Sequence, residues 1–175
     1  HEPDNLGALA TLMQVCEHRR DAEQAAQYRE RLRKVTKNGT VIPVSVSIVI
    51  PVLNNIELTK QCLVAIERTD GLTMTEIIVV DNASTDGTPE FLADTQRQEK
   101  LQFIRNETNQ GFACACNQGA ARARGKFVVF LNNDTVVTPG WLDAMMATAR
   151  RPEVGVVGAK LLYPDGTIQH AGIGW

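Results

Sequence analysis

The stretch that decides the fold is EIIVVDNASTDGTPEF, residues 76–91. Residues 76–80, which are β-branched after the glutamate, predict a buried strand. A polar turn follows at 81–87, and Pro89 stands where a helix would begin. A buried strand that leads through a polar turn into a helix is the repeating unit of an α/β fold with parallel strands.

The same alternation of strand and helix continues on both sides of this stretch. A β-branched run at 45–52 predicts a strand, and the pattern after it predicts a helix at 57–68. The other expected strands are 102–105, 127–131 and 154–162, and the other expected helices begin at 89 or cover 114–124 and 140–150. This order predicts a mostly parallel sheet with helices on both faces. Ligands of such sheets bind beyond the carboxyl ends of the strands, so the site should lie there.

Residues 1–36 have a different, helical texture. Apolar and small residues recur there at three- and four-residue steps, and Asp21 and Gln24 have the spacing of a capping box. The segment resembles a tetratricopeptide-like helical hairpin, and an ordinary N-terminal hairpin is the alternative. A single hairpin cannot bury its apolar face alone, so a protein partner is expected there. Residues 37–44 predict a linker, and residues 45–175 the α/β domain.

Composition excludes several classes of protein. The 175 residues carry 18 Lys+Arg and 20 Asp+Glu, a formal net charge of −2, so nucleic acid is not an expected partner. No apolar run reaches the roughly eighteen residues of a transmembrane span. No secretory signal is visible at the start, which predicts a cytoplasmic protein, free or peripherally bound at the inner face of the membrane. The 4 cysteines have neither CxxC nor zinc-site spacing.

Polar side chains follow three of the expected strands at the point where each strand ends. They are Asn54-Asn55 after the first strand, Asp81-Asn82 after the second and Asn132-Asn133-Asp134 after the fourth. Because the carboxyl ends of parallel strands meet at one edge, these side chains together can hold a hydroxyl-rich ligand or a hard cation. Asp and Asn also end strands merely as turn residues and helix caps, which accounts for any one of these positions taken alone.

Two common phosphate-binding motifs are missing. No Gly-x-Gly-x-x-Gly follows the first expected strand. Gly125-Lys126 differs from a P-loop because residue 127 is Phe and the pair precedes a strand instead of following one. Neither a dinucleotide-binding fold nor a P-loop fold is therefore expected.

Three segments, VIPVLN at 49–54, IVVDNASTDG at 78–87 and LNNDT at 131–135, together resemble the family 2 glycosyltransferases. The similarity continues through NQGFA at 109–113 and PDGTIQHAG at 164–172, and it is greatest to the rhamnosyltransferase-like branch. The resemblance implies a GT-A fold, which is Rossmann-like, a UDP- or dTDP-sugar donor and inverting transfer of a hexose. It also implies a glycan or lipid-linked acceptor and a role in cell-surface polysaccharide biosynthesis.

The resemblance assigns nucleotide-binding roles to residues at the first two strand ends. Pro51 and Asn54 would line the nucleotide pocket. Asp81, with Asn82 beside it, would hydrogen-bond the pyrimidine base or its ribose. These assignments predict that the nucleoside lies over the ends of the first two strands.

The third strand end is expected to bind the diphosphate and a divalent cation, Mg²⁺ or Mn²⁺. Asn132-Asn133-Asp134 occupies the place of the family's Asp-x-Asp motif, so Asp134 would bind the metal. Asn132 would face the ribose, and Asn133 joins the nucleotide-binding set. The asparagine at the first position removes one negative charge, so nucleotide binding is more firmly implied than metal dependence. His170 is a further candidate to approach the diphosphate or the metal.

The catalytic base is not identified in this sequence. Inverting transfer requires a carboxylate within reach of the attacking hydroxyl, and the resemblance places it in the acceptor half of the family domain. The downstream acids Asp143, Glu153 and Asp165 fall in an expected helix or in turns. We therefore expect the base beyond Trp175, and a C-terminally truncated chain that binds nucleotide but transfers sugar poorly. The alternative is a non-catalytic module that binds a sugar nucleotide and a protein partner.

Overall fold

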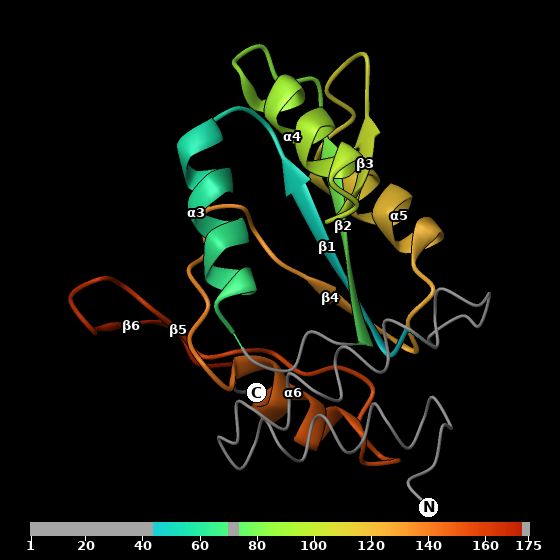
Figure 1. Ribbon diagram of the computed structural model, residues 1–175. Helices are drawn as coiled ribbons and strands as arrows, with labels where there is room; N and C mark the ends of the chain where they lie inside the picture. Colours follow the sequence, from blue (N-terminus) through green and yellow to red (C-terminus); the bar gives the residue numbers. More distant parts are fainter. Residues whose placement is uncertain (1–43, 70–73, 173–175) are drawn as a thin grey trace, which may run out of the picture. The chain divides into compact units, whose positions relative to one another are not determined.

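The computed structural model describes residues 44–69 and 74–172 (Figure 1). They fall into two compact units, one ending at Val137 and the other beginning at Thr138. The expected helical hairpin at 1–36 and most of the linker at 37–44 lie outside the described residues.

The first unit is built on a four-stranded sheet in the order β3-β2-β1-β4, in which every neighbouring pair is parallel. The strands are β1 (Val46–Val52), β2 (Thr75–Asp81), β3 (Gln102–Arg105) and β4 (Phe127–Phe130). All residues of β1 are buried, as its place between β2 and β4 requires. The register pairs the last residues of β1, β2 and β3 with one another, so these strands end at one level. The expected parallel sheet is confirmed.

Helices cover both faces of this sheet, as the sequence predicts. They are α3 (Ile56–Glu67), α4 (Thr88–Arg97) and α5 (Phe112–Arg122). Right-handed crossovers place α3 and α4, which contact each other, on one face, and α5 on the other. Ala115 of α5 packs there in a buried cluster with residues of β1 and β2. A Cβ at Gly119 would overlap Val49, so glycine is required for this close approach.

The chain reverses its direction across the sheet between β3 and β4. The first three strands proceed outward from β1, and β4 then pairs with the opposite side of β1 (Figure 1). The carboxyl ends of β1 and β4 therefore form the topological switch point at which open α/β sheets bind ligands.

The second unit contains α6 (Trp141–Ala149) and a two-stranded antiparallel sheet of β5 (Leu161–Leu162) and β6 (Ile168–His170). The helix confirms the expectation for 140–150. The expected strand at 154–162 is wrong, because 154–160 have no regular structure and only the last two residues pair. Val156 is 91% exposed. A β-branched run becomes a buried strand only where a partner and a covering layer exist, which the run itself does not specify.

None of the helices that the structure describes combines the length and the apolar character that a bilayer span requires.

The buried carboxylate of Glu76 joins neighbouring segments by hydrogen bonds at the edge of the sheet where the strands begin. Glu76 is 9% exposed and accepts hydrogen bonds from Ser47 Oγ at 2.6 Å and from the Arg124 N–H at 2.7 Å. Its other oxygen accepts from Gln102 Nε2 at 2.8 Å and pairs with the Arg124 guanidinium. Burial opposes ionisation, but the hydrogen bonds from Ser47 and Arg124 outweigh it and hold the pKa of Glu76 below its ordinary value. Glu76 therefore ties the turn before β4 to β1 and β3.

We predict that Glu76→Gln lowers the free energy of unfolding by about 2 kcal/mol, because the new amide NH₂ would face the donors of Gln102 and Arg124. The ionised carboxylate stabilises the fold above its unfolded-state pKa of about 4.3. That contribution is lost as the pH falls through the lower pKa of the folded state. Urea unfolding at several pH values measures both effects.

Glu57→Gln is the control, since its exposed pair with Lys60 contributes only about 0.5 kcal/mol. Equal losses of unfolding free energy in the two variants would contradict the prediction.

Candidate functional site

The loop after β1 and the loop after β2 are joined by hydrogen bonds at the carboxyl edge of the sheet. The Asn54 N–H donates to Ser84 Oγ at 2.7 Å, and Asn54 Oδ1 accepts the Thr85 N–H at 2.8 Å. Asn54 and Asn55 have φ values of 59° and 60°, in the left-handed region that asparagine tolerates better than most residues. Asparagine at this turn therefore does two things: it adopts the left-handed backbone conformation, and it binds the neighbouring loop through hydrogen bonds.

The carboxylate of Asp86 serves two helices at once. Its Oδ2 accepts the N–H of Ile56, the first residue of α3, at 3.1 Å. Its Oδ1 accepts the N–H of Thr88, the first residue of α4, at 3.0 Å. A negative charge at the N-terminus of a helix is favourable, and here one charge stabilises two helix starts.

Asp81 lies fully buried beneath the same loop. Its Oδ1 accepts the Ser84 N–H at 2.9 Å, and its Oδ2 accepts from Arg105 Nη1 at 3.0 Å. Arg105 Nη2 also donates to the Ser84 carbonyl oxygen at 3.2 Å. These contacts make Asp81 the internal support of the loop after β2.

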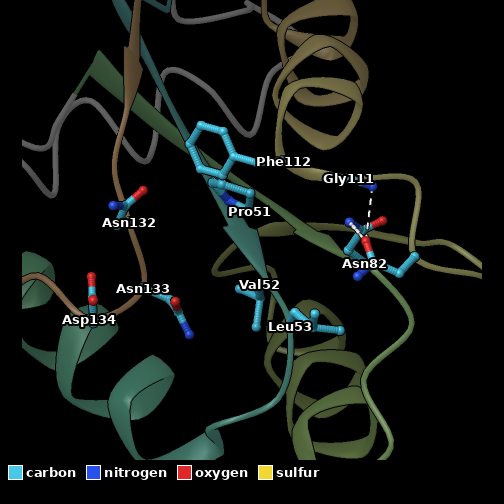
Figure 2. Close-up of a pocket in the computed structure, with 10 residues that line it drawn as sticks. Pro51, Val52, Leu53, Asn82, Gly111, Phe112, Asn132, Asn133 and Asp134 are labelled. Carbon is cyan, nitrogen blue, oxygen red and sulfur yellow. Dashed lines mark hydrogen bonds between the residues drawn. The ribbon is translucent and has the colours of Figure 1, made fainter.

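A cavity of about 350 Å³ opens at the carboxyl ends of β1, β2 and β4, at the switch point of the sheet. It is lined by Pro51, Val52, Leu53, Asn82, Asn109, Gly111, Phe112, Asn132, Asn133 and Asp134. Figure 2 shows Asn82 on one side and Asn132–Asp134 on the other, with Val52 between them and the Phe112 ring beside Pro51. The cavity is thus polar at two ends and apolar between them, which suits an elongated ligand with two polar ends.

The structure brings most of the predicted site residues together around this cavity. Those that line it are Pro51, Asn82, Asn132, Asn133 and Asp134. Asn54 and Asp81 lie at the same edge but not in the lining, which differs from the direct nucleotide contact expected of them. The physical reason is that Asp81 is fully buried, and that Asn54 Oδ1 accepts both the N–H and the hydroxyl of Thr85. His170 belongs to β6 of the second unit, where it is exposed.

Helix α3 holds the Asn132–Asp134 segment in place. Asn133 Nδ2 donates to Thr59 Oγ1 at 3.0 Å, and the Cys62 thiol donates to the Asn132 carbonyl oxygen at 3.7 Å. Burial, aided by the negative charge of Asp134, raises the pKa of Cys62 to about 12, so the thiol stays protonated and remains a donor. The sequence carried no motif for Thr59 or Cys62. Their only signal is a polar or thiol group on the buried face of an amphipathic helix.

Asp134 has the chemistry that a divalent cation at a diphosphate requires. Its side chain is exposed and accepts no hydrogen bond from the described residues. Mg²⁺ at such sites is commonly held by one or two carboxylates, by substrate phosphates and by water. Asp134, with the Asn132 amide oxygen near it on the cavity wall, fits that pattern. In the part of the chain that the structure describes, no group of three or more His, Cys, Asp or Glu side chains could hold a metal ion.

The opposite end of the cavity is formed by Asn82 and Asn109, which we call the amide pair. Asn82 Nδ2 donates to Asn109 Oδ1 at 2.6 Å. Asn82 Oδ1 accepts the Gln110 N–H at 2.9 Å, and Asn109 Oδ1 accepts the Gly111 N–H at 2.9 Å. Gly111 has a φ of 83°, which lets the loop turn sharply into α5. The sequence prediction gave Asn109, Gly111 and Phe112 no role, although a polar Asn-x-Gly before a helix is a recognisable loop signal.

The parallel sheet, with its cavity and acidic strand end at the switch point, defines an α/β protein of the GT-A type. The chain belongs to glycosyl transferase family 2, whose model matches residues 47–171. It is 36% identical over 131 residues, 73% of this chain, to the O-antigen biosynthesis protein RfbC of Myxococcus xanthus. It is 30% identical over 104 residues, 53% of this chain, to the N-acetylglucosaminyl-diphospho-decaprenol L-rhamnosyltransferase of Mycobacterium tuberculosis.

Among solved structures, the mannosyltransferase PcManGT from Pyrobaculum calidifontis, in complex with GDP-Man and Mn²⁺, is similar with a TM-score of 0.59. The two are 26% identical, and the match covers 86% of this chain and 46% of that one. The chain spans 10% of the Myxococcus protein and 33% of the Mycobacterium protein. It therefore corresponds to a part of each of these relatives.

We predict that Thr59→Val loosens the Asn132–Asp134 segment, because valine keeps the shape of threonine but cannot accept the bond from Asn133. The expected loss in the free energy of unfolding is about 1 kcal/mol, with weaker Mn²⁺-dependent nucleotide binding. Thr95→Val is the matched control, since its hydroxyl donates to the Phe91 carbonyl within α4 and lies outside the cavity lining. Calorimetry with UDP and Mn²⁺ compares the two variants, and unchanged binding in Thr59→Val would count against this role.

Proposed function

We infer that this chain binds a nucleoside-diphosphate sugar across the end of β1 and forms the donor half of a glycosyltransferase. One observation carries the proposal: a single cavity has the exposed carboxylate of Asp134 at one end and the amide pair at the other, in a chain of glycosyl transferase family 2. The diphosphate would lie at Asn132–Asp134 and the nucleoside at Asn82. The GDP-Man and Mn²⁺ bound by the mannosyltransferase support a sugar nucleotide and a divalent cation as ligands here.

Different residues of the cavity would bind the cation and the nucleoside. Asp134 and Asn132 would hold the Mg²⁺ or Mn²⁺, which, when bound, neutralises the negative charge that develops on the leaving diphosphate. Pro51 and Phe112 offer an apolar surface to the nucleoside, and the Phe112 ring, which is 61% exposed, is free to contact it. Val52 contributes to the apolar wall between the two polar ends.

The remaining expected residues have positioning roles in this proposal. Asn54 and Asp81 act on the nucleotide through the two loops that they hold, since Asp81 is fully buried and Asn54 Oδ1 accepts both the N–H and the hydroxyl of Thr85. Asn133 acts through Thr59 in the same way. His170 stays a candidate for the diphosphate or the metal.

We propose that the donor is a UDP- or dTDP-sugar and that a hexose is transferred with inversion to a glycan or lipid-linked acceptor. The names of the relatives, one in O-antigen biosynthesis and one a rhamnosyltransferase acting on a diphospho-decaprenol, support this class of acceptor and a role at the cell surface. The catalytic base is proposed to lie beyond Trp175. Asp165 is a weakened base, because the hydrogen bonds from the Thr167 hydroxyl and N–H to its Oδ1 lower the pKa of its carboxyl.

The proposal extends to the organisation and location of the chain. Residues 1–36 would form a hairpin that binds a protein partner, joined by the linker at 37–44 to the transferase domain at 45–175. Cytoplasmic action, free or at the inner face of the membrane, is proposed from the nature of a nucleotide-activated donor.

We predict that Asp134→Asn weakens UDP binding in the presence of Mn²⁺ about tenfold, because the amide cannot neutralise the cation. Titration calorimetry of the 175-residue chain with UDP or dTDP, with Mn²⁺ or with chelator, measures the effect. In chelator, the variant should bind at least as tightly as the unmodified chain, because a carboxylate without its cation repels the diphosphate.

Asp94→Asn is the matched control, because it removes the same charge from an exposed ion pair with Arg97 on α4. Its Mn²⁺-dependent affinity should not change. Binding of UDP by Asp134→Asn as tightly as by the unmodified chain would show that the diphosphate lies elsewhere.

A further inference from the structure

Two large apolar side chains of β4 are exposed at the edge of the sheet. Val128 and Phe130 are 40% and 52% exposed. The register pairs Phe130 with Val49, whose side chain meets Gly119 of α5, so Phe130 points to the side of the sheet that α5 covers. Val128 points the same way, because side chains alternate along a strand. We call the surface formed by Val128 and Phe130 the β4 face.

Helix α5 leaves the β4 face exposed because the helix packs on β1 and β2. Gln118 marks the side of α5 that is turned toward β3, since it exchanges two hydrogen bonds with Asn106, directly after β3. By helical spacing, Ala113 and Ala120 lie on the opposite side of α5, toward β4. Their methyl groups are too small to cover a phenylalanine ring on the neighbouring strand.

The chain enters the sheet beside this strand. The Phe127 N–H donates to the Ser45 carbonyl oxygen at 3.1 Å, so the residues before Ser45 start from the amino end of β4. The linker at 37–44 alone spans about 26 Å when extended, whereas the four residues of β4 span about 13 Å. Residues 1–36 are therefore able to reach the β4 face.

The first half of this segment has the composition that the β4 face requires. Apolar residues recur there at three- and four-residue steps, at Leu6, Leu9, Met13 and Cys16. Residues 1–17 contain three acids and no Lys or Arg, a formal side-chain charge of −3. Residues 18–36 contain six Lys or Arg and three acids, a charge of +3. The acidic half complements the exposed Lys126, which directly precedes β4.

We propose that residues 6–16 cover the β4 face of the same chain as an amphipathic helix. The inference goes beyond the proposed function and does not depend on the nucleotide site. The apolar positions of the segment remove Val128 and Phe130 from water, which is favourable in proportion to the apolar area buried. The basic half at 18–36 is left for the proposed protein partner. An edge strand also invites a second copy of the chain, and the test separates that occupant.

Hydrogen exchange of the 175-residue chain tests this docking, because an isolated helix of this length is marginal in water and its amides exchange rapidly. We expect the amides of residues 10–16 to exchange about tenfold faster, or more, in Phe130→Asp, since a carboxylate at 130 would be buried beneath apolar side chains. Val64→Asp is the matched control, because Val64 is 41% exposed on α3, on the other side of the sheet. Its rates at residues 10–16 should equal those of the unmodified chain.

Met13→Asp tests the same contact from the other partner and leaves the sheet untouched. Hydroxyl-radical labelling of the Phe130 side chain should increase about threefold or more in this variant, because the ring loses its cover. Protection of the β1 amides in every variant confirms that the sheet is folded.

Three results would overturn the docking. The first is exchange at residues 10–16 that is equally fast in the unmodified chain and in Phe130→Asp. The second is slow exchange there that Phe130→Asp leaves unchanged, or labelling of Phe130 that Met13→Asp leaves unchanged. The third is protection of the β4 face that depends on protein concentration, with a dimer in sedimentation, which would assign the face to a second copy.

Discussion

One carboxylate sets the geometry of the ligand edge. Asp86 accepts the first N–H of α3 and the first N–H of α4, so two helices that begin at the ends of neighbouring strands share one cap. Asn54 and Asp81 add bonds between and beneath the same loops. Parallel strands bring the loops at their carboxyl ends close together, but they do not determine the conformation of these loops. These polar bonds supply the rigidity that a precise binding site requires.

The fixed loops leave other side chains free to face the cavity. Asp81, whose oxygens are bonded within the protein, is buried, whereas Asp134 at the end of β4 is exposed and unbonded among the described residues. The amide pair combines the two roles, because both residues line the cavity and their oxygens hold the loop before α5. This division explains how one edge of the sheet can be both rigid and open. It also explains why a polar residue at a strand end is not by itself a ligand contact.

Much of the fold could be predicted because β1 and β2 are β-branched runs followed by turn residues, a local signal that burial between layers reinforces. The run at 154–162 carries the same local signal, but within the described residues only Leu161–Leu162 pair with another strand, and this could not be read from composition. The polar ends of β1, β2 and β4 predicted the place of the site. The sequence could not distinguish Asp81 from Asn82 as the cavity-facing residue, because that depends on Arg105, which approaches from β3.

The proposed function requires that the ligand binds in one orientation, with the diphosphate at Asn132–Asp134 and the base at the amide pair. Nuclear magnetic resonance of the chain with UDP and Mn²⁺ tests it directly, because Mn²⁺ broadens the signals of nearby nuclei. The account predicts that Mn²⁺ with UDP broadens the backbone signals of residues 132–135. It predicts that UDP alone shifts the side-chain amide signals of Asn82 and Asn109. Unbroadened signals at 132–135, with broadening centred elsewhere in the chain, would contradict it.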